Sequence, residues 1–194
     1  MIKPNCNGVV ALFRYADDAV ICCQYDSDAQ RIRQVLTHRL AKYKLQLNEE
    51  KTKLVKFNKR LAAKGVTQET FDFLGFTFYW GKSMKGSTIP KMKTKAKTMK
   101  AKLNKVTSWI KQVKDIFPLR KIGNIFQAKL RGHIQYYGVS HNSRQVMSFI
   151  YQAKRIVFKW LNRRSQRKSF TWEKFSLFVK ANPLPEMRIV HRFF

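Results

Sequence analysis

Residues 13–21 of the chain read FRYADDAVI. Two apolar runs, residues 9–15 and 19–22, flank an adjacent pair of aspartates, Asp17 and Asp18. Because the flanking residues favour strands and the acidic pair interrupts them, the stretch predicts a β-hairpin with both aspartates at its turn. Two carboxylates with no Lys or Arg in the turn repel each other unless a cation joins them, and a Mg²⁺ site for nucleotidyl transfer requires such a pair. An ordinary hydrophilic turn is the alternative interpretation, and the motif alone does not separate the two.

The chain carries a large excess of positive charge. It has 40 Lys and Arg against 11 Asp and Glu, a net charge of +29 over 194 residues, and a pI near 10.5. Residues 91–194 hold 25 of the basic residues and only three acidic ones, a net charge of +22, whereas residues 1–90 have a net charge of +7. A basic surface of this size predicts a polyanionic partner. Basic disorder is not expected, because 44% hydrophobic and 13% aromatic residues are enough for a packed core.

The sequence favours neither a membrane protein nor a disulfide-stabilised protein. No apolar run approaches the roughly 20 residues of a spanning helix, and the first residues contain no signal-peptide apolar region. Nucleic acid is therefore the expected partner, with no membrane and a cytoplasmic location. The three cysteines, Cys6, Cys22 and Cys23, include no C-x-x-C pair, so neither a zinc site nor a disulfide framework is indicated.

The first part of the chain reads as mixed α/β. After the hairpin, Asp28 is the predicted N-cap of a helix that runs to Tyr43, since apolar residues recur there every three and four positions. Residues 54–57 predict a short strand, and residues 71–78 predict two short strands or one bent strand around Gly75.

A turn-rich stretch at residues 81–90 predicts a linker between two domains. Beyond it, residues 99–113, 122–137 and 146–161 show the apolar period of three amphipathic helices, the third capped by Asn142 or Ser143. A shorter helix is predicted after Thr171. The fold class is therefore α+β, with a mixed domain at residues 1–80 and an all-α bundle at residues 91–194.

Several further motifs follow the aspartates. Residues 47–53 read LNEEKTK, residues 73–76 FLGF and residues 130–139 LRGHIQYYGV, followed by FKWLNRRSQ at 158–166 and RIVH at 188–191. Together with YADD at residues 15–18, they resemble the C-terminal part of bacterial group II intron reverse transcriptases, also called intron-encoded maturases. The resemblance covers nearly the whole chain.

The resemblance implies a partial reverse-transcriptase palm at residues 1–80, followed at 91–194 by a thumb and maturase-specific helical domain. It implies that Asp17 and Asp18 hold catalytic Mg²⁺ in a completed RNA-directed DNA polymerase site, and that Lys51 approaches the departing pyrophosphate. The residues that would form the primer grip are Phe73, Leu74, Gly75 and Phe76.

The chain also departs from the family. There, a third catalytic aspartate lies on a strand well before the aspartate hairpin, whereas none of the 16 residues before Asp17 is acidic. Two-metal catalysis needs carboxylates from more than one strand. We therefore expect the back half of such an enzyme, as a truncated gene, a split subunit or a fragment. It is not expected to polymerise DNA without an N-terminal fingers and palm partner.

The expected RNA partners are a group II intron RNA and a template–primer duplex, because a Lys/Arg-covered bundle suits recognition of phosphates and 2′-hydroxyls. A solvated basic face is the alternative for any single residue. His133 is expected to pack, and Tyr137 to lie in the core, with stacking of Tyr136 or Tyr137 on unpaired bases as the alternative. The leading RNA contacts are Lys93, Lys97, Lys100, Arg131, Arg155, Arg163, Arg164, Arg167 and Lys168.

Two function classes remain open. One is an enzyme fragment that regains reverse transcription when the missing half is supplied. The other is a stand-alone RNA-binding or splicing-assistance module without catalysis. A generic basic protein of ribosomal type is a third and less favoured interpretation, because it leaves the aspartate hairpin unexplained.

Overall fold

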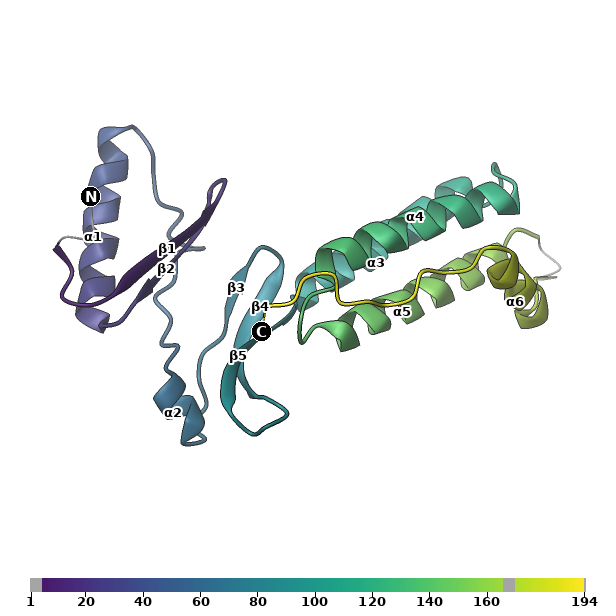
Figure 1. Cartoon of the computed structure of the whole chain (residues 1–194). Helices are drawn as coiled ribbons and strands as arrows, with labels where there is room; N and C mark the ends of the chain where they lie inside the picture. The colour runs from purple at the N-terminus through teal and green to yellow at the C-terminus, as the bar shows by residue number, and fades with distance from the viewer. Residues whose placement is uncertain (1–4, 166–169, 194) are drawn as a thin grey trace. The chain divides into compact units, whose positions relative to one another are not determined.

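The computed structural model describes residues 5–165 and 170–193 (Figure 1). The chain divides into two compact units. Residues 1–74 and 78–89 form the first, called here the hairpin unit, and residues 75–77 and 90–194 form the second, called the helical unit. No helix of the described residues is long and apolar enough to span a membrane.

The predicted aspartate hairpin is confirmed. Strands β1 (Val10–Tyr15) and β2 (Asp18–Cys23) pair antiparallel in a register that places Tyr15 opposite Asp18. Ala16 and Asp17 form a two-residue loop, and Ala16 has a φ of +50°, the sign that the first loop residue takes in a type II′ turn. The structure refines the prediction, because Asp17 lies in the loop whereas Asp18 is the first residue of β2.

Helix α1 (Asp26–Lys42) contacts β2 and buries Ile32 (Figure 1). The predicted cap is wrong, because Tyr25, three residues earlier, occupies the N-cap position and the helix begins at Asp26. Asp28 is instead buried, and its carboxylate accepts hydrogen bonds from the backbone N–H groups of Asn7 (3.1 Å) and Gly8 (2.9 Å). This carboxylate fastens the segment before β1 to α1.

The strand predicted at residues 54–57 is absent from the described residues. The backbone N–H groups there are bound by side chains instead: Lys56 donates to the Glu69 carboxylate at 2.8 Å, and Asn58 donates to the Gln68 amide oxygen at 3.2 Å. Side-chain acceptors thus replace a neighbouring strand. Asn58 then caps the short helix α2 (Lys59–Ala63).

The two short strands predicted around Gly75 are confirmed as β3 (Phe71–Phe73) and β4 (Phe76–Lys82). Leu74 and Gly75 have φ values of +50° and +78°, the signs that both loop residues take in a type I′ hairpin. The third strand, β5 (Thr88–Thr94), gives the sheet order β3-β4-β5.

Residues 81–90, predicted as a linker, include the end of β4 and the start of β5, and the division between the two units falls between Ile89 and Pro90. The turn-rich residues 83–87 connect β4 to β5, and Gly86 supplies a φ of +79° there. Pro90 lies within β5, which its position at the edge of the sheet allows, because proline cannot donate to a second neighbour.

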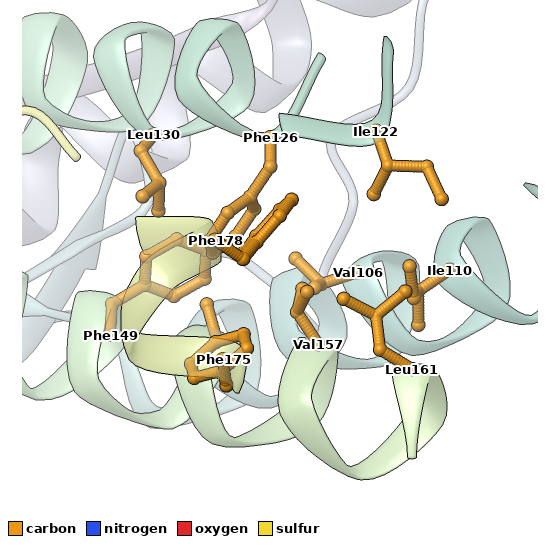
Figure 2. Close-up of a cluster of buried hydrophobic side chains, with 11 residues drawn as sticks. Val106, Ile110, Ile122, Phe126, Leu130, Phe149, Val157, Leu161, Phe175 and Phe178 are labelled. Atoms are coloured by element: carbon orange, nitrogen blue, oxygen red, sulfur yellow. The ribbon is translucent and has the colours of Figure 1, made fainter. Parts of the chain in front are cut away.

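The helical unit contains α3 (Ala96–Val113), α4 (Leu119–Tyr137), α5 (Ser143–Leu161) and α6 (Trp172–Ala181). All four predicted helices are confirmed, and Pro118 and Gly138 bound α4 as N-cap and C-cap. Helix α6 completes the bundle, since Phe175 and Phe178 project into the core between the longer helices (Figure 2). The buried cluster comprises Val106, Ile110, Ile122, Phe126, Leu130, Phe149, Ala153, Val157, Leu161, Phe175 and Phe178.

Asn142 occupies the predicted N-cap position of α5, but its side chain does not cap the helix. The fully buried amide accepts from the backbone N–H of Thr94 (2.8 Å) and donates to the Thr94 hydroxyl (2.9 Å) and the Tyr137 carbonyl (2.8 Å). Asn142 therefore joins the end of β5 to the turn between α4 and α5.

Candidate functional site

The aspartate pair lies at the exposed tip of the hairpin. Arg14 closes the loop from the β1 side, since its Nε donates to the Ala16 carbonyl at 2.9 Å. In the strand register Arg14 pairs with Ala19 and Tyr15 with Asp18. Because side chains alternate between the two faces of a strand, Arg14 and Asp18 project from opposite faces. Arg14 therefore does not pair with Asp18, and no ion pair joins Asp17 or Asp18 to a basic side chain among the described residues.

The two carboxylates supply part of a Mg²⁺ ligand set and not a complete one. Mg²⁺ is bound through carboxylates and other oxygens, so Asp17 and Asp18 are suitable ligand types. No group of three or more His, Cys, Asp or Glu that could hold a metal occurs in the described ranges, residues 5–165 and 170–193. The hairpin alone therefore does not fit a catalytic pair of ions.

Lys51 lies in a turn that Asn48 organises. The Lys51 backbone N–H donates to the Asn48 side chain at 3.1 Å, and the Thr52 hydroxyl donates to the Asn48 carbonyl at 2.8 Å. The Lys51 side chain is exposed, and no ion pair joins it to either aspartate in the part of the chain that is described. A role for Lys51 at pyrophosphate stays a prediction.

The predicted primer grip coincides with the β3–β4 turn. Phe73 ends β3, Leu74 and Gly75 form the loop, and Phe76 begins β4. The Gly75 carbonyl accepts from the Lys95 backbone N–H at 3.0 Å. The loop is thus tied to the residue before α3.

Gly75 and Phe76 are packed rather than free to meet a ligand. A Cβ at Gly75 would lie 3.0 Å from the Tyr137 hydroxyl, so the absence of a side chain accommodates Tyr137. Phe76 is buried, with its ring centroid 5.2 Å from that of Tyr137 and 5.9 Å from that of Tyr136. Packing therefore accounts for these two residues, and contact with a primer stays a prediction.

The basic residues singled out from the sequence lie on several elements of the helical unit. Lys93 is on β5, Lys97 and Lys100 are one turn apart on α3, and Arg131 is on α4. All of these side chains are exposed, as are those of Arg155, Arg163 and Arg164 on α5 and immediately after it. Arg167 and Lys168 lie outside the described residues.

The charge on these helices is not balanced locally. Helices α3, α4 and α5 contain no Asp or Glu. Of the three acidic residues after residue 90, Asp115 forms an ion pair with Lys114. Three consecutive helices thus expose basic side chains and contain no acidic residue.

Several basic side chains of the helical unit lie over aromatic rings. These contacts were not predicted from the sequence. The Trp160 ring has Lys111 Nζ at 4.7 Å and Arg163 Cζ at 5.2 Å from its centroid. Such distances favour cation–π attraction. The i, i+3 and i, i+4 spacing of ring and cation on one helix was the sequence signal for some of these pairs. The other pairs in the helical unit are Lys102–Tyr137, Lys121–Phe117, Lys129–Trp109 and Arg155–Tyr151.

His133 packs in the bundle as expected. Its ring centroid is 3.6 Å from that of Phe149 and 4.7 Å from that of Tyr137. Neither ring nitrogen has a hydrogen-bond partner among the described residues. Burial, with a contribution from the positive charge of Lys102, lowers the pKa of His133 from 6.5 to about 4. The imidazole is therefore neutral near pH 7.

Burial also lowers the pKa of Lys102, and the neighbouring Lys105 adds to the effect. Lys102 Nζ lies 5.0 Å from the Tyr137 ring centroid, so the ring partly replaces the water that this ammonium loses. Residues 130–139 thus contain a buried neutral histidine, His133, and the Tyr137 ring over which Lys102 of α3 lies.

Comparison with known families bears on the hairpin unit. Residues 2–78 match the family described as reverse transcriptase (RNA-dependent DNA polymerase). The match supports a reverse transcriptase fragment over these residues, which include Asp17, Asp18 and Lys51. No curated protein and no solved structure matches the chain. The α+β architecture is compatible with a palm fragment followed by a helical region, and α3–α6 lie outside the matched residues.

Proposed function

We propose that the chain is the C-terminal part of a group II intron-type reverse transcriptase and maturase, and that its helical unit binds structured RNA. The reverse transcriptase match at residues 2–78 supports the first statement, together with the order of the motifs that follow the aspartate hairpin. The observation that carries the second is the acid-free surface of α3, α4 and α5.

Charge and exposure favour RNA as the partner of the helical unit. A net charge of +22 over residues 91–194 disfavours a compact state unless a polyanion neutralises it. The exposed cations lie on separate helices rather than in one cleft, which suits the spaced phosphates of an A-form helix. Contacts of this kind position an RNA without reading its sequence.

The hairpin unit supports an incomplete polymerase site. Asp17 and Asp18 would hold Mg²⁺ only when further ligands come from another strand. We propose that an N-terminal fingers and palm polypeptide provides that strand, so that RNA-directed DNA synthesis belongs to the completed assembly and not to these residues alone.

A stand-alone RNA-binding or splicing-assistance module is the second candidate. The observation that favours it is that the helical unit has its own buried core, made of residues from all four helices. Under this alternative the aspartate hairpin has no catalytic role.

The salt dependence of RNA binding tests the proposal. If the full chain neutralises six or more phosphates, the slope of log affinity against log salt is on the order of −5 or steeper. Replacing Arg163 and Arg164 by Gln should make the slope shallower by about 2. The matched double variant Lys59→Gln/Arg60→Gln, an adjacent exposed pair on α2, should leave it unchanged. A wild-type slope near zero would refute RNA binding through phosphates.

A further inference from the structure

The outward face of α5 carries an aromatic side chain between cations. Met147, Tyr151 and Arg155 follow one another at intervals of four residues and therefore share a face. Met147 is 53% exposed and Tyr151 is 61% exposed. The buried residues of α5, which include Ala153 and Val157, lie on the opposite side of the helix.

Tyr151 differs from most other large aromatic residues of the bundle. Trp109 stacks on Phe126, and Phe158 stacks on Trp172, so these rings have aromatic neighbours. No other ring of the described residues packs on Tyr151. No aromatic neighbour therefore covers this ring, and its side chain is largely exposed to solvent.

Cations flank the Tyr151 ring along the helix. The Arg155 guanidinium lies over the ring, with Cζ 5.7 Å from the centroid, and can cover only one of its two faces. Arg144 and Lys159 are exposed on the same side of α5, seven residues before and eight residues after Tyr151. At 1.5 Å per residue these positions lie about 10 and 12 Å along the axis from Tyr151.

We propose that Tyr151 is a stacking platform for an unpaired RNA base, and that Arg144, Arg155 and Lys159 bind the phosphates on either side of that base. Every base has a π-face, so stacking on a tyrosine takes an unpaired nucleotide of any sequence. An apolar protein surface is a poorer occupant, because Arg155 lies over the ring, two further cations lie on the same side of the helix, and α5 contains no carboxylate. The inference deepens the proposed function and rests on it.

Two RNAs that differ only in pairing test the platform. One is a hairpin with a fluorescent 2-aminopurine in an unpaired loop, and the other is a fully paired duplex of the same length. Tyr151→Ala in the full chain should weaken binding of the loop RNA about tenfold and abolish 2-aminopurine quenching, with less than a twofold effect on the duplex. Tyr151→Phe, which keeps the ring, should retain both affinities.

Tyr43→Ala is the matched control, because Tyr43 is 68% exposed and is the C-cap of α1 in the hairpin unit, outside the acid-free helices. It should leave both affinities unchanged. If Tyr151→Ala weakens binding of the loop RNA and of the duplex equally, the stacking proposal is overturned. Unchanged binding of both RNAs would also overturn it and would assign this face of α5 to another kind of partner, such as an acidic protein. Wild-type chain that binds neither RNA would overturn the proposed function as well, whereas a steep wild-type salt slope with an inert Tyr151 would overturn the platform alone.

Discussion

Acid should destabilise the helical unit through His133. The folded pKa of about 4 lies below the ordinary 6.5, so the unfolded chain binds the proton more readily. The stability contributed by the neutral imidazole is therefore complete above pH 6.5 and is lost as the pH falls towards 4.

The expected loss of unfolding free energy follows from the pKa values of His133 in the folded and unfolded chain. At pH 5 the linkage amounts to about 2 kcal/mol of lost unfolding free energy relative to neutral pH, and below pH 4 it approaches about 3 kcal/mol. The geometry supports a cost of this order, because protonation would place a charge between the Phe149 and Tyr137 rings with neither nitrogen hydrogen-bonded among the described residues.

Urea unfolding at pH 7 and pH 5, followed by far-UV circular dichroism, measures the effect. His133→Phe keeps a ring against Phe149 and removes the titration, so its unfolding free energy should fall by about 2 kcal/mol less than that of wild type between these pH values. The carboxylates titrate in both proteins and cancel in the comparison. His38→Gln, at an exposed histidine of α1, should behave as wild type. Equal losses for wild type and His133→Phe would refute the reasoning.

Three further outcomes follow from the structure. Replacing two glycines of α4 by Ala should change the unfolding free energy, measured by urea denaturation, in opposite directions. A Cβ at Gly132 meets no atom within 4 Å, so Gly132→Ala should raise it by about 0.5–1 kcal/mol. A Cβ at Gly123 collides with the Asn182 side chain at the C-cap of α6, so Gly123→Ala should lower it. Asn142→Ala should cost about 1–3 kcal/mol in the same assay, because it leaves the buried N–H of Thr94 unpaired and removes one of the two hydrogen bonds to the Tyr137 carbonyl; a loss under 0.5 kcal/mol would contradict this. Primer-extension assays with Mg²⁺ should detect no DNA synthesis by the chain alone and should detect synthesis once a fingers and palm fragment is added. Asp17→Asn should abolish that synthesis and leave RNA binding unchanged. Primer extension by the chain alone would contradict this and imply a further carboxylate ligand.

Local patterns predicted most of the elements. The hairpin at residues 10–23 followed from strand formers around an acidic break, and the four helices of the bundle followed from apolar periodicity bounded by Pro118 and Gly138. These signals lie within a few residues of the structure that they determine, so no knowledge of the tertiary fold was needed.

Two of the errors involve partners that are distant in the chain. Asp28 has the composition of a helix cap, but it binds backbone groups twenty and twenty-one residues before it. Asn142 similarly binds Thr94, 48 residues away, instead of capping α5. Such contacts cannot be read from spacing alone. Strand β5 is a different case, because its neighbour β4 is close in the chain and the turn residues between the two strands have the composition of a linker.

Some features of the candidate site could be predicted from local sequence and others could not. The position of Asp17 and Asp18 at a hairpin tip was predictable, because two apolar runs enclose them. The cations held over aromatic rings were partly encoded in helical spacing, as with Tyr151 and Arg155. The contact of the Phe76 ring with Tyr137 depends on packing between separate elements and could not be predicted from either segment.

Lysine footprinting with and without a structured RNA tests the central claim most directly. An amine-reactive reagent reports the exposure of each lysine in the full chain. The account predicts that RNA protects Lys93, Lys97 and Lys100 of the helical unit and leaves Lys59 and Lys64 around α2 reactive. Equal protection of the two groups, or no protection of the first group at an RNA concentration that saturates the chain, would contradict it.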